Sequence, residues 1–387
     1  MCCNFAIRKI TLFNPNIFHS SLFSLSLFYE MRCRNLEAVS IFGQSIECLN
    51  VSRDIYENSE DKSYFEIVLG HITAYLGLHH TYILKYQQAI ELLEEAVRLL
   101  KNDQTQLIKA QAQVMLGWAY QYLFKLPKAI DLYTDSLMIF QDENVVWWKT
   151  LTLELLAGAY ITVGKIEESV PLYEEALKFT EPGDLRLRTP LLTGLGRVYY
   201  LRGDYHEAEK VMKECLDLCL LLGNSRQTAL SLLCVGQVAM ALGQIQKAEK
   251  YFRESAEMLD DFGESSDLGV VLLYLGKSLA TLHRNDEARK TFQKLCHIGQ
   301  VIDLPSMVCI GLINIAQLLL DEGHTQKALE MILVLRRFPL VVKTWQNESD
   351  QLWNEIRLRF SEQEINAALS RVESWTLESL LNLPIQV

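Results

Sequence analysis

One stretch of the chain contains the pattern that decides its fold: residues 229–254 read ALSLLCVGQVAMALGQIQKAEKYFRE. Its first half, up to Ala239, carries apolar residues at intervals of three and four, as an amphipathic helix does. The same spacing returns from Lys247 to Glu254, and Gly243 lies between the two halves. Glycine suits the end of a helix because it adopts a positive φ without strain. The stretch therefore predicts two helices joined by a short turn.

This unit recurs along the chain with a period of forty residues. Small residues stand 40, 40, 39, 40, 40 and 40 residues apart, and each is followed twelve residues later by a second small residue. The first set is Gly77, Gly117, Ala157, Gly196, Gly236, Gly276 and Ala316, and the second set is Ala89, Ala129, Ser169, Ala208, Ala248, Ala288 and Ala328. Such self-similarity is the signature of a repeat architecture. We expect seven helical hairpins in which the small residues let two helices approach closely.

Glycines also mark the turns within the hairpins and the links between them. Gly164, Gly203, Gly243 and Gly323 lie seven residues after the first small residue of their unit. Gly183, Gly223 and Gly263 each stand at the expected end of a second helix, and Asp184, Asn224 and Glu264 follow them as polar helix starts. Because one hairpin cannot bury both faces of its helices, stability requires that neighbouring hairpins stack. The sequence predicts an all-α solenoid.

The repeat resembles the tetratricopeptide repeat (TPR). The signature of that family stands here as Leu195-Gly196-Arg197-Val198-Tyr199, followed by Gly203, Tyr205 and Ala208. Similar matches occur in the second and third units, and the resemblance covers about residues 65–340. It implies a right-handed α-solenoid of about seven to eight antiparallel helical hairpins. Because the usual TPR period is about 34 residues, the longer period here predicts longer helices.

Forty-residue units with a glycine-polar link are most similar to the MalT/AfsR-like TPR arm of signal-responsive regulators. Residues 360–369 and 375–380 are similar to the segment that often closes such arms. We expect a degenerate N-terminal repeat or cap over residues 31–64, seven repeats over 65–340 and a C-terminal helical cap over 341–387. Ser361 and Glu364 have the spacing of a capping box. The sequence shows no ATPase or DNA-binding pattern, so a nucleotide switch is not carried over.

Residues 1–30 are an apolar, serine-rich N-terminal extension. Residues 11–29 carry no formal charge and follow Arg8 and Lys9, as in a signal peptide or membrane anchor. Polar residues and a proline interrupt the apolar stretch, however, and no small-residue cleavage site follows. Three interpretations stay open. The segment is a disordered or mis-started extension, in which case Met31 is the true start; it is a capping segment; or it is a targeting segment.

Composition and charge narrow the class of partner. The chain has 387 residues, with 37 basic and 48 acidic side chains and a formal net charge of −11. This acidic balance, with no three adjacent basic residues, argues against binding of nucleic acid. Nine cysteines, an odd number at irregular spacing, do not indicate a disulfide framework and favour a reducing cytosol. We expect a cytoplasmic protein with no membrane span.

Candidate chemical motifs in the sequence have simpler structural interpretations. Gly158–Lys165 departs from a phosphate-binding loop in its glycine spacing and lacks the Ser or Thr after the lysine. Cys215, Cys219 and Cys234 could in principle hold a metal ion, but Cys215 occupies a small helix-packing position, which favours a role in the core. The adjacent His79–His80 pair points to different helix faces. We therefore expect no enzymatic activity, no cofactor and no metal.

The resemblance also implies where a partner would bind. In TPR arrays the first helix of each unit lines the concave groove, through residues one, four and five after its small position. Carried over to this chain, the predicted groove residues are Leu78, Tyr82, Trp118, Gln121, Tyr122, Arg197, Tyr200, Gln237, Met240, Lys277 and Gln317. Trp118, Tyr122 and Arg197 are the preferred anchors, because large aromatic residues and arginine dominate interface energetics. Such a mixture of aromatic, amide and cationic side chains suits a peptide.

These observations predict a non-enzymatic scaffold or adaptor that binds a protein or peptide of unknown identity in its groove. A first alternative is a ligand-sensing regulatory arm that acts on a separately encoded ATPase or transcription factor. A second alternative is a Rap-type phosphatase or inhibitor of response regulators, which the chain resembles in size and repeat length. Rap-type proteins carry an N-terminal helical bundle that residues 1–30 do not resemble, so this alternative is disfavoured.

Overall fold

The computed structural model describes most of the chain as helices joined by short turns. The described residues are 15–32, 34–51, 53–56, 62–101, 105–142, 145–181, 184–223, 225–261, 263–338, 340 and 342–381, and these contain no β-strand. Gly183 and Asn224, which the sequence assigns to links between repeats, lie outside the described residues. The chain divides into two compact units, Met1–Arg202 and Gly203–Val387.

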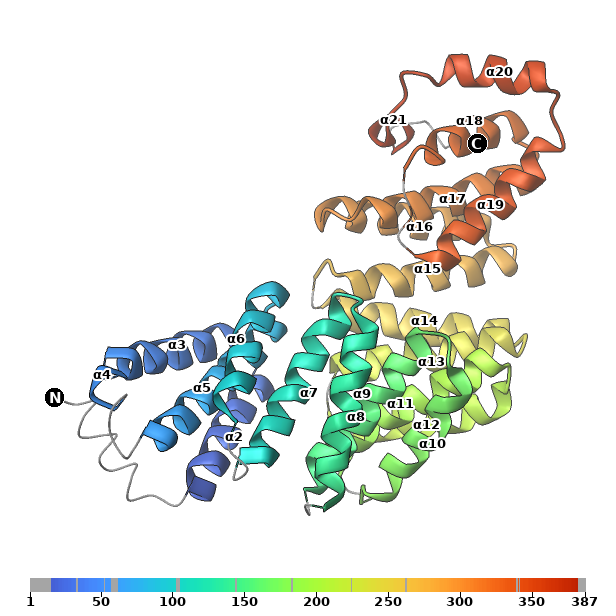
Figure 1. The fold of residues 1–387 in the computed structure, drawn as a ribbon. Coiled ribbons are helices and arrows are strands. Elements are labelled where there is room, and N and C mark those ends of the chain that lie inside the picture. The colour runs from blue at the N-terminus through green and yellow to red at the C-terminus, as the bar shows by residue number, and fades with distance from the viewer. Residues whose placement is uncertain are drawn as a thin grey trace. The chain divides into compact units, whose positions relative to one another are not determined.

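Among the described residues of unit 1, three helices precede the repeats. These are α2 (Pro15–Met31), α3 (Asn35–Val51) and α4 (Arg53–Tyr56). The repeat helices of unit 1 are α5 (Lys62–Tyr82), α6 (Tyr86–Leu99), α7 (Gln106–Tyr122), α8 (Leu126–Asp142), α9 (Val146–Thr162), α10 (Ile166–Lys178) and α11 (Leu185–Arg202). Each helix packs on the next along the chain from α5 to α11, so the unit is built of stacked hairpins (Figure 1).

Unit 2 contains the remaining repeat helices and the C-terminal helices. The repeat helices are α12 (Tyr205–Leu222), α13 (Ser225–Ala241), α14 (Ile245–Asp260), α15 (Ser266–Thr281), α16 (Asn285–Val301), α17 (Pro305–Asp321) and α18 (Thr325–Leu335). After them come α19 (Lys343–Arg357), α20 (Glu362–Arg371) and α21 (Leu377–Leu381). Neighbouring helices again pack pairwise, and one hydrophobic core extends from α13 to α21. The all-α hairpin fold predicted from the sequence is confirmed.

The two sets of small residues lie where the helices of a hairpin meet. All seven members of the second set, from Ala89 to Ala328, are fully buried. Four glycines of the first set, however, lie against a large side chain sixteen residues later: Gly77, Gly117, Gly236 and Gly276. A Cβ atom placed on Gly77 would come within 2.6 Å of Leu93, and one placed on Gly276 would come within 2.4 Å of Phe292. The small residue therefore makes room for a bulky side chain of the second helix, which refines the prediction.

The turn inside each hairpin uses a left-handed residue, as the glycine pattern predicts. Gly164, Gly203, Gly243 and Gly323 have φ between 73° and 87° in the same position of their units. Three units place another residue there: Leu84, Phe124 and His283 have φ of 63°, 56° and 58°. Non-glycine residues are strained in this region because Cβ approaches the following carbonyl oxygen. The backbone of the repeat thus imposes one turn geometry, and glycine is only its preferred residue.

Residues 1–64 contribute helices that pack beside the first repeat. Within residues 1–30, the described part forms α2, which packs against α3 and α5. Residues 31–64 contribute α3, which also packs against α5, and the four-residue helix α4. Phe42 of α3 is 1% exposed and stacks on the Tyr75 ring of α5, at 6.2 Å between centroids. These three helices therefore belong to the packed body of unit 1.

At the other end, three helices cover the last repeat of unit 2. α19 packs against α17 and α18, α20 packs against α18, and α21 packs against α17 and α18. Ser361 and Glu364 form the predicted capping box at the start of α20, with reciprocal bonds between side chain and backbone. Leu352, Ile356 and Leu380 are buried in the core of unit 2. The C-terminal helices thus close the hydrophobic end of the repeat array.

Candidate functional site

The first helices of unit 1 carry a line of aromatic side chains. Tyr82 of α5 and Trp118 of α7 meet edge to face, with ring centroids 5.2 Å apart. Trp118 lies 6.2 Å from Tyr122 on the next turn of α7, and Tyr122 stacks on Tyr86 of α6 at 4.9 Å. Tyr122 is 49% exposed and Trp118 is partly buried. This surface offers aromatic area to a partner without the cost of ordering flexible side chains.

Next to these rings, α2 lies on the faces of α5, α7 and α9. Phe23 of α2 meets Trp147 at 5.1 Å, edge to face, and lies 6.2 Å from Trp148. The side chains around the contact enclose a cavity of only about 30 Å³. The α2 side chains are Phe23, Ser26, Leu27 and Glu30, and the others are Tyr75, Leu78, Tyr82, Val114, Met115, Trp118, Trp147, Trp148 and Leu151. We call the surface that α5, α7 and α9 present to α2 the groove of unit 1.

A buried histidine fastens α2 and α3 to this groove. His79 of α5 is fully buried, and its Nδ1 lies 2.8 Å from Asn35 Oδ1, to which it donates. Its Nε2 is therefore the acceptor for the Ser26 hydroxyl, at 3.0 Å. Burial, together with the charge of His80, lowers the pKa of His79 to about 4. The ring is neutral near pH 7, as the expected structural role of this histidine requires.

Polar groups gather on α7 to α10, beyond the aromatic rings. The Tyr133 hydroxyl donates to Gln121 Oε1 at 2.9 Å. Burial raises the pKa of Glu154, on α9, to about 7. The Glu154 carboxyl in turn raises the pKa of Tyr133 and Tyr173, adding to the larger effect of their own burial. A carboxyl with this pKa is partly protonated at neutral pH and can both donate and accept hydrogen bonds.

The structure brings together some of the predicted groove residues of unit 1. Leu78, Tyr82 and Trp118 line one cavity, although Leu78 is itself buried at 7% exposure. Arg197 and Tyr200 lie on α11, where Arg197 is exposed and Tyr200 is half-buried. The predicted groove residues of unit 1 therefore lie on three of its first helices, α5, α7 and α11.

In unit 2 the predicted groove residues lie on α13, α15 and α17 and are half-buried. Met240 packs against the core, and Gln317 donates to Asp321 on its own helix at 2.9 Å. Lys277 forms an ion pair with Glu348 of α19, at 2.6 Å. The C-terminal helix α19 thus holds one of the two cations that the sequence assigns to partner binding.

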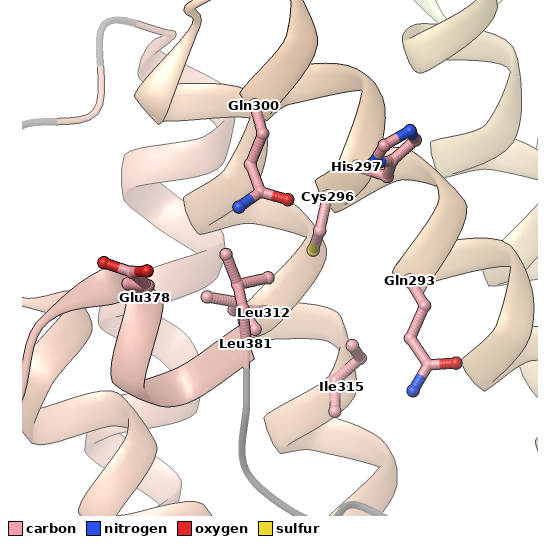
Figure 2. A pocket seen from close by; sticks show the side chains of 8 residues that line it. All are labelled: Gln293, Cys296, His297, Gln300, Leu312, Ile315, Glu378 and Leu381. Atoms are coloured by element: carbon pink, nitrogen blue, oxygen red, sulfur yellow. The ribbon is translucent and has the colours of Figure 1, made fainter.

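Unit 2 also contains a larger cavity, of about 330 Å³, between α16, α17 and α21. Gln293, Cys296, His297, Gln300, Leu312, Ile315, Glu378 and Leu381 line it, as Figure 2 shows. Cys296 and the adjacent His297 both line this cavity, and a cysteine with a histidine is the residue pair of a nucleophile and its base. Burial raises the pKa of Cys296 to about 12, however, so the thiol stays protonated and unreactive.

Sequence reasoning missed several residues of these two cavities. Trp147 and Trp148 lie on the groove of unit 1 but stand two to three turns before the positions that the TPR resemblance selects. The paired tryptophans at the start of a first helix were the available signal. By contrast, the predicted core role of Cys215 and Cys219 is confirmed, since both are buried with their sulfur atoms 3.6 and 3.2 Å from Ser231 Oγ.

Comparisons with known proteins agree with the repeat fold. A family model described as the MalT-like TPR region matches residues 70–336, whereas no curated protein matches the chain. Among the helices of the described residues, none has the length and apolar character needed to cross a membrane.

Three solved structures illustrate the likeness in fold. A Rap protein complexed with competence and sporulation factor is 12% identical, with a TM-score of 0.58 over 94% of this chain and 99% of that one. Aspartyl phosphate phosphatase F from Bacillus subtilis is 17% identical, with a TM-score of 0.55 over 87% of each chain. A signal transduction ATPase with numerous domains and a tetratricopeptide repeat sensor, from Pyrococcus horikoshii, is 17% identical, with a TM-score of 0.56 over 98% of this chain and 54% of that one.

Proposed function

Because the chain belongs to the family of MalT-like TPR regions, we propose that it is a non-enzymatic module that binds a protein or peptide on the first helices of its repeats. The TPR-type repeat fold is typically a binding scaffold rather than a catalytic one. The observation that supports the proposal best is the aromatic line on α5 to α7, in which Trp118 bridges Tyr82 and the half-exposed Tyr122.

The chemistry of this surface suits a polypeptide partner. The rings supply apolar contact area, and the Gln121 amide and the exposed Arg197 supply hydrogen-bond donors for carbonyl or carboxylate groups. The cavity in unit 2 supports enzymatic function less well, because its cysteine is held protonated. We therefore place partner recognition on Trp118, Tyr122 and Arg197.

The proposal is tested by affinity capture from the native lysate with the full chain and with a Trp118→Ala/Tyr122→Ala/Arg197→Ala variant. The matched control is Met138→Ala, which truncates a side chain that is 60% exposed on the second helix α8. Circular dichroism should show that all three chains keep their helices. We expect one set of proteins to bind wild type and control and to be lost from the triple variant. Equal capture by all three chains would place binding on another surface.

A second candidate function is a regulatory arm acting on a separately encoded ATPase or transcription factor. The family match and the likeness to a chain that carries a TPR sensor on an ATPase favour this reading. It differs from a scaffold in one measurable respect. When the captured partner is purified and mixed with this chain, a regulatory arm changes the rate of ATP hydrolysis or the affinity for DNA, whereas a scaffold leaves both unchanged.

A further inference from the structure

The side chains that α2 presents to the groove of unit 1 follow one helical stripe. Phe23, Ser26, Leu27 and Glu30 stand at positions i, i+3, i+4 and i+7. This spacing is how an amphipathic helix anchors itself in the groove of a receptor. The solvent side of α2 carries Leu25, which is 37% exposed. The chain therefore places one of its own segments on this surface in the manner of a helical ligand.

The groove of unit 1 sets chemical requirements for each anchor. Trp147 and Trp148 surround the first position and favour an aromatic ring there. His79 Nε2 accepts a hydrogen bond at the second position, which a small hydroxyl side chain can donate. A charged side chain at either of these two positions would be buried without a partner, at a high energetic cost. The groove thus selects a helix with an aromatic, a small hydroxyl and an aliphatic anchor.

The fit of α2 to the groove is incomplete. The Tyr75 hydroxyl belongs to a residue that is 2% exposed, yet among the described residues it has no hydrogen-bond partner. Tyr75 lines the same cavity, whose volume of about 30 Å³ exceeds what one water needs. Phe23 and Leu27 are only partly buried. A helix of similar pattern that fills this space and reaches Tyr75 can bind better than α2 does.

We propose that the groove of unit 1 is a receptor for an amphipathic helix of a partner protein, and that α2 is a tethered occupant which the partner helix displaces. This proposal rests on the proposed function and names the class of partner. The partner helix carries an aromatic residue, a Ser or Thr and an aliphatic residue at i, i+3 and i+4, with no charge at these three positions.

The tether explains why the displacement needs a good ligand. α3 begins at Asn35, four residues after the end of α2 at Met31. A short connection gives the attached helix a millimolar effective concentration at its site, so a free helix at micromolar concentration competes poorly. Weakening the anchors of α2 should therefore open the groove to a helix supplied in trans.

The test uses the full chain and a fluorescently labelled synthetic peptide of residues 15–31 with a solubilising lysine tail. Phe23→Asp releases α2 by placing a charge between the tryptophans, and Leu27→Asp serves as a second release variant. Leu25→Asp is the matched control, since it adds the same charge on the solvent side. Hydrogen exchange of α2 amides reports release. We expect the peptide to bind the release variants at least about tenfold more tightly than wild type or control, and a Phe23→Ala peptide to lose this binding.

Equal peptide affinity for all four chains, or a lack of binding once hydrogen exchange shows α2 released, would overturn the proposal. So would unchanged exchange of α2 in both release variants, because an occupant that cannot leave is not displaceable. Lysate capture that depends on Trp118, Tyr122 and Arg197 would survive such a result. A failure of the helix receptor is therefore distinguishable from a failure of the binding function itself.

Discussion

Replacing Gly276 by alanine should destabilise unit 2, although alanine is the better helix former. The new Cβ would lie 2.4, 2.7 and 2.8 Å from three ring atoms of Phe292, which is 1% exposed and enclosed in the core. Overpacking of this kind costs about 1–3 kcal/mol, whereas the gain in helix propensity is about 1 kcal/mol. We expect a net loss of up to about 2 kcal/mol in the free energy of unfolding.

The chain itself supplies a control and a compensating change. Gly43 in α3 has nothing within 4 Å of its Cβ position, so Gly43→Ala should stabilise by about 0.5–1 kcal/mol. Ala316 occupies the same repeat position as Gly276, and the residue sixteen positions later there is Ile332 in place of an aromatic ring. A Gly276→Ala/Phe292→Ile double variant should therefore be more stable than the sum of its single effects implies.

Urea denaturation followed by far-ultraviolet circular dichroism measures these changes in the free energy of unfolding. Hydrogen exchange of α15 and α16 amides is measured as well, because repeat arrays need not unfold in one step and the effect must be located in the array. We expect opposite shifts of the midpoint for Gly276→Ala and Gly43→Ala. If Gly276→Ala raises the midpoint as Gly43→Ala does, or if the double variant shows no coupling, the packing argument for the first small position is wrong.

Three further predictions concern a turn and two titrating groups. Phe124→Gly should stabilise unit 1 by about 1 kcal/mol in thermal unfolding, because the residue is left-handed (φ 56°) and its side chain is 79% exposed; a lower melting temperature would contradict this. His79 is held neutral, because its pKa is lowered to about 4. The free energy of unfolding should therefore fall by about 3 kcal/mol as the pH drops from 6.5 to 4. A His79→Gln variant should show a smaller fall over this pH range. Glu154 has the opposite sign: its pKa is raised to about 7, so the stability of its protonated form is lost as the pH rises from 4.5 through 7. Glu154→Gln should then stabilise the chain at pH 8 but not at pH 4, and an equal effect at both pH values would refute the assignment.

The predicted site follows from the sequence only in part. Leu78, Tyr82 and Trp118 were selected by their offset from the small residues, and all three line the groove of unit 1. Trp147 and Trp148 were not predicted, because the residues were chosen one, four and five positions after the first small residue of each unit. That choice covers about one turn of each first helix, whereas the groove of unit 1 extends toward the starts of these helices. Lys277 was assigned to a partner, but its charge is paired with Glu348, which lies 71 residues away in the chain. An ion pair between residues so far apart in the chain cannot be predicted from the spacing of residues within one repeat.

The sequence by itself determined the forty-residue hairpin unit, its register along the chain and the turn in the four units that carry a glycine there. These features are local: helical periodicity, the paired small residues and the left-handed turn at seven residues past Gly236 each act over one forty-residue unit and repeat. Only the tertiary structure decided what covers the repeats. The docking of α2 through Phe23 and Ser26, and of α19 through Glu348, depends on surfaces assembled from several helices. A segment that packs on such a surface contacts it through only a few side chains. Those side chains can be recognised as contacts only when the positions of the other helices are known.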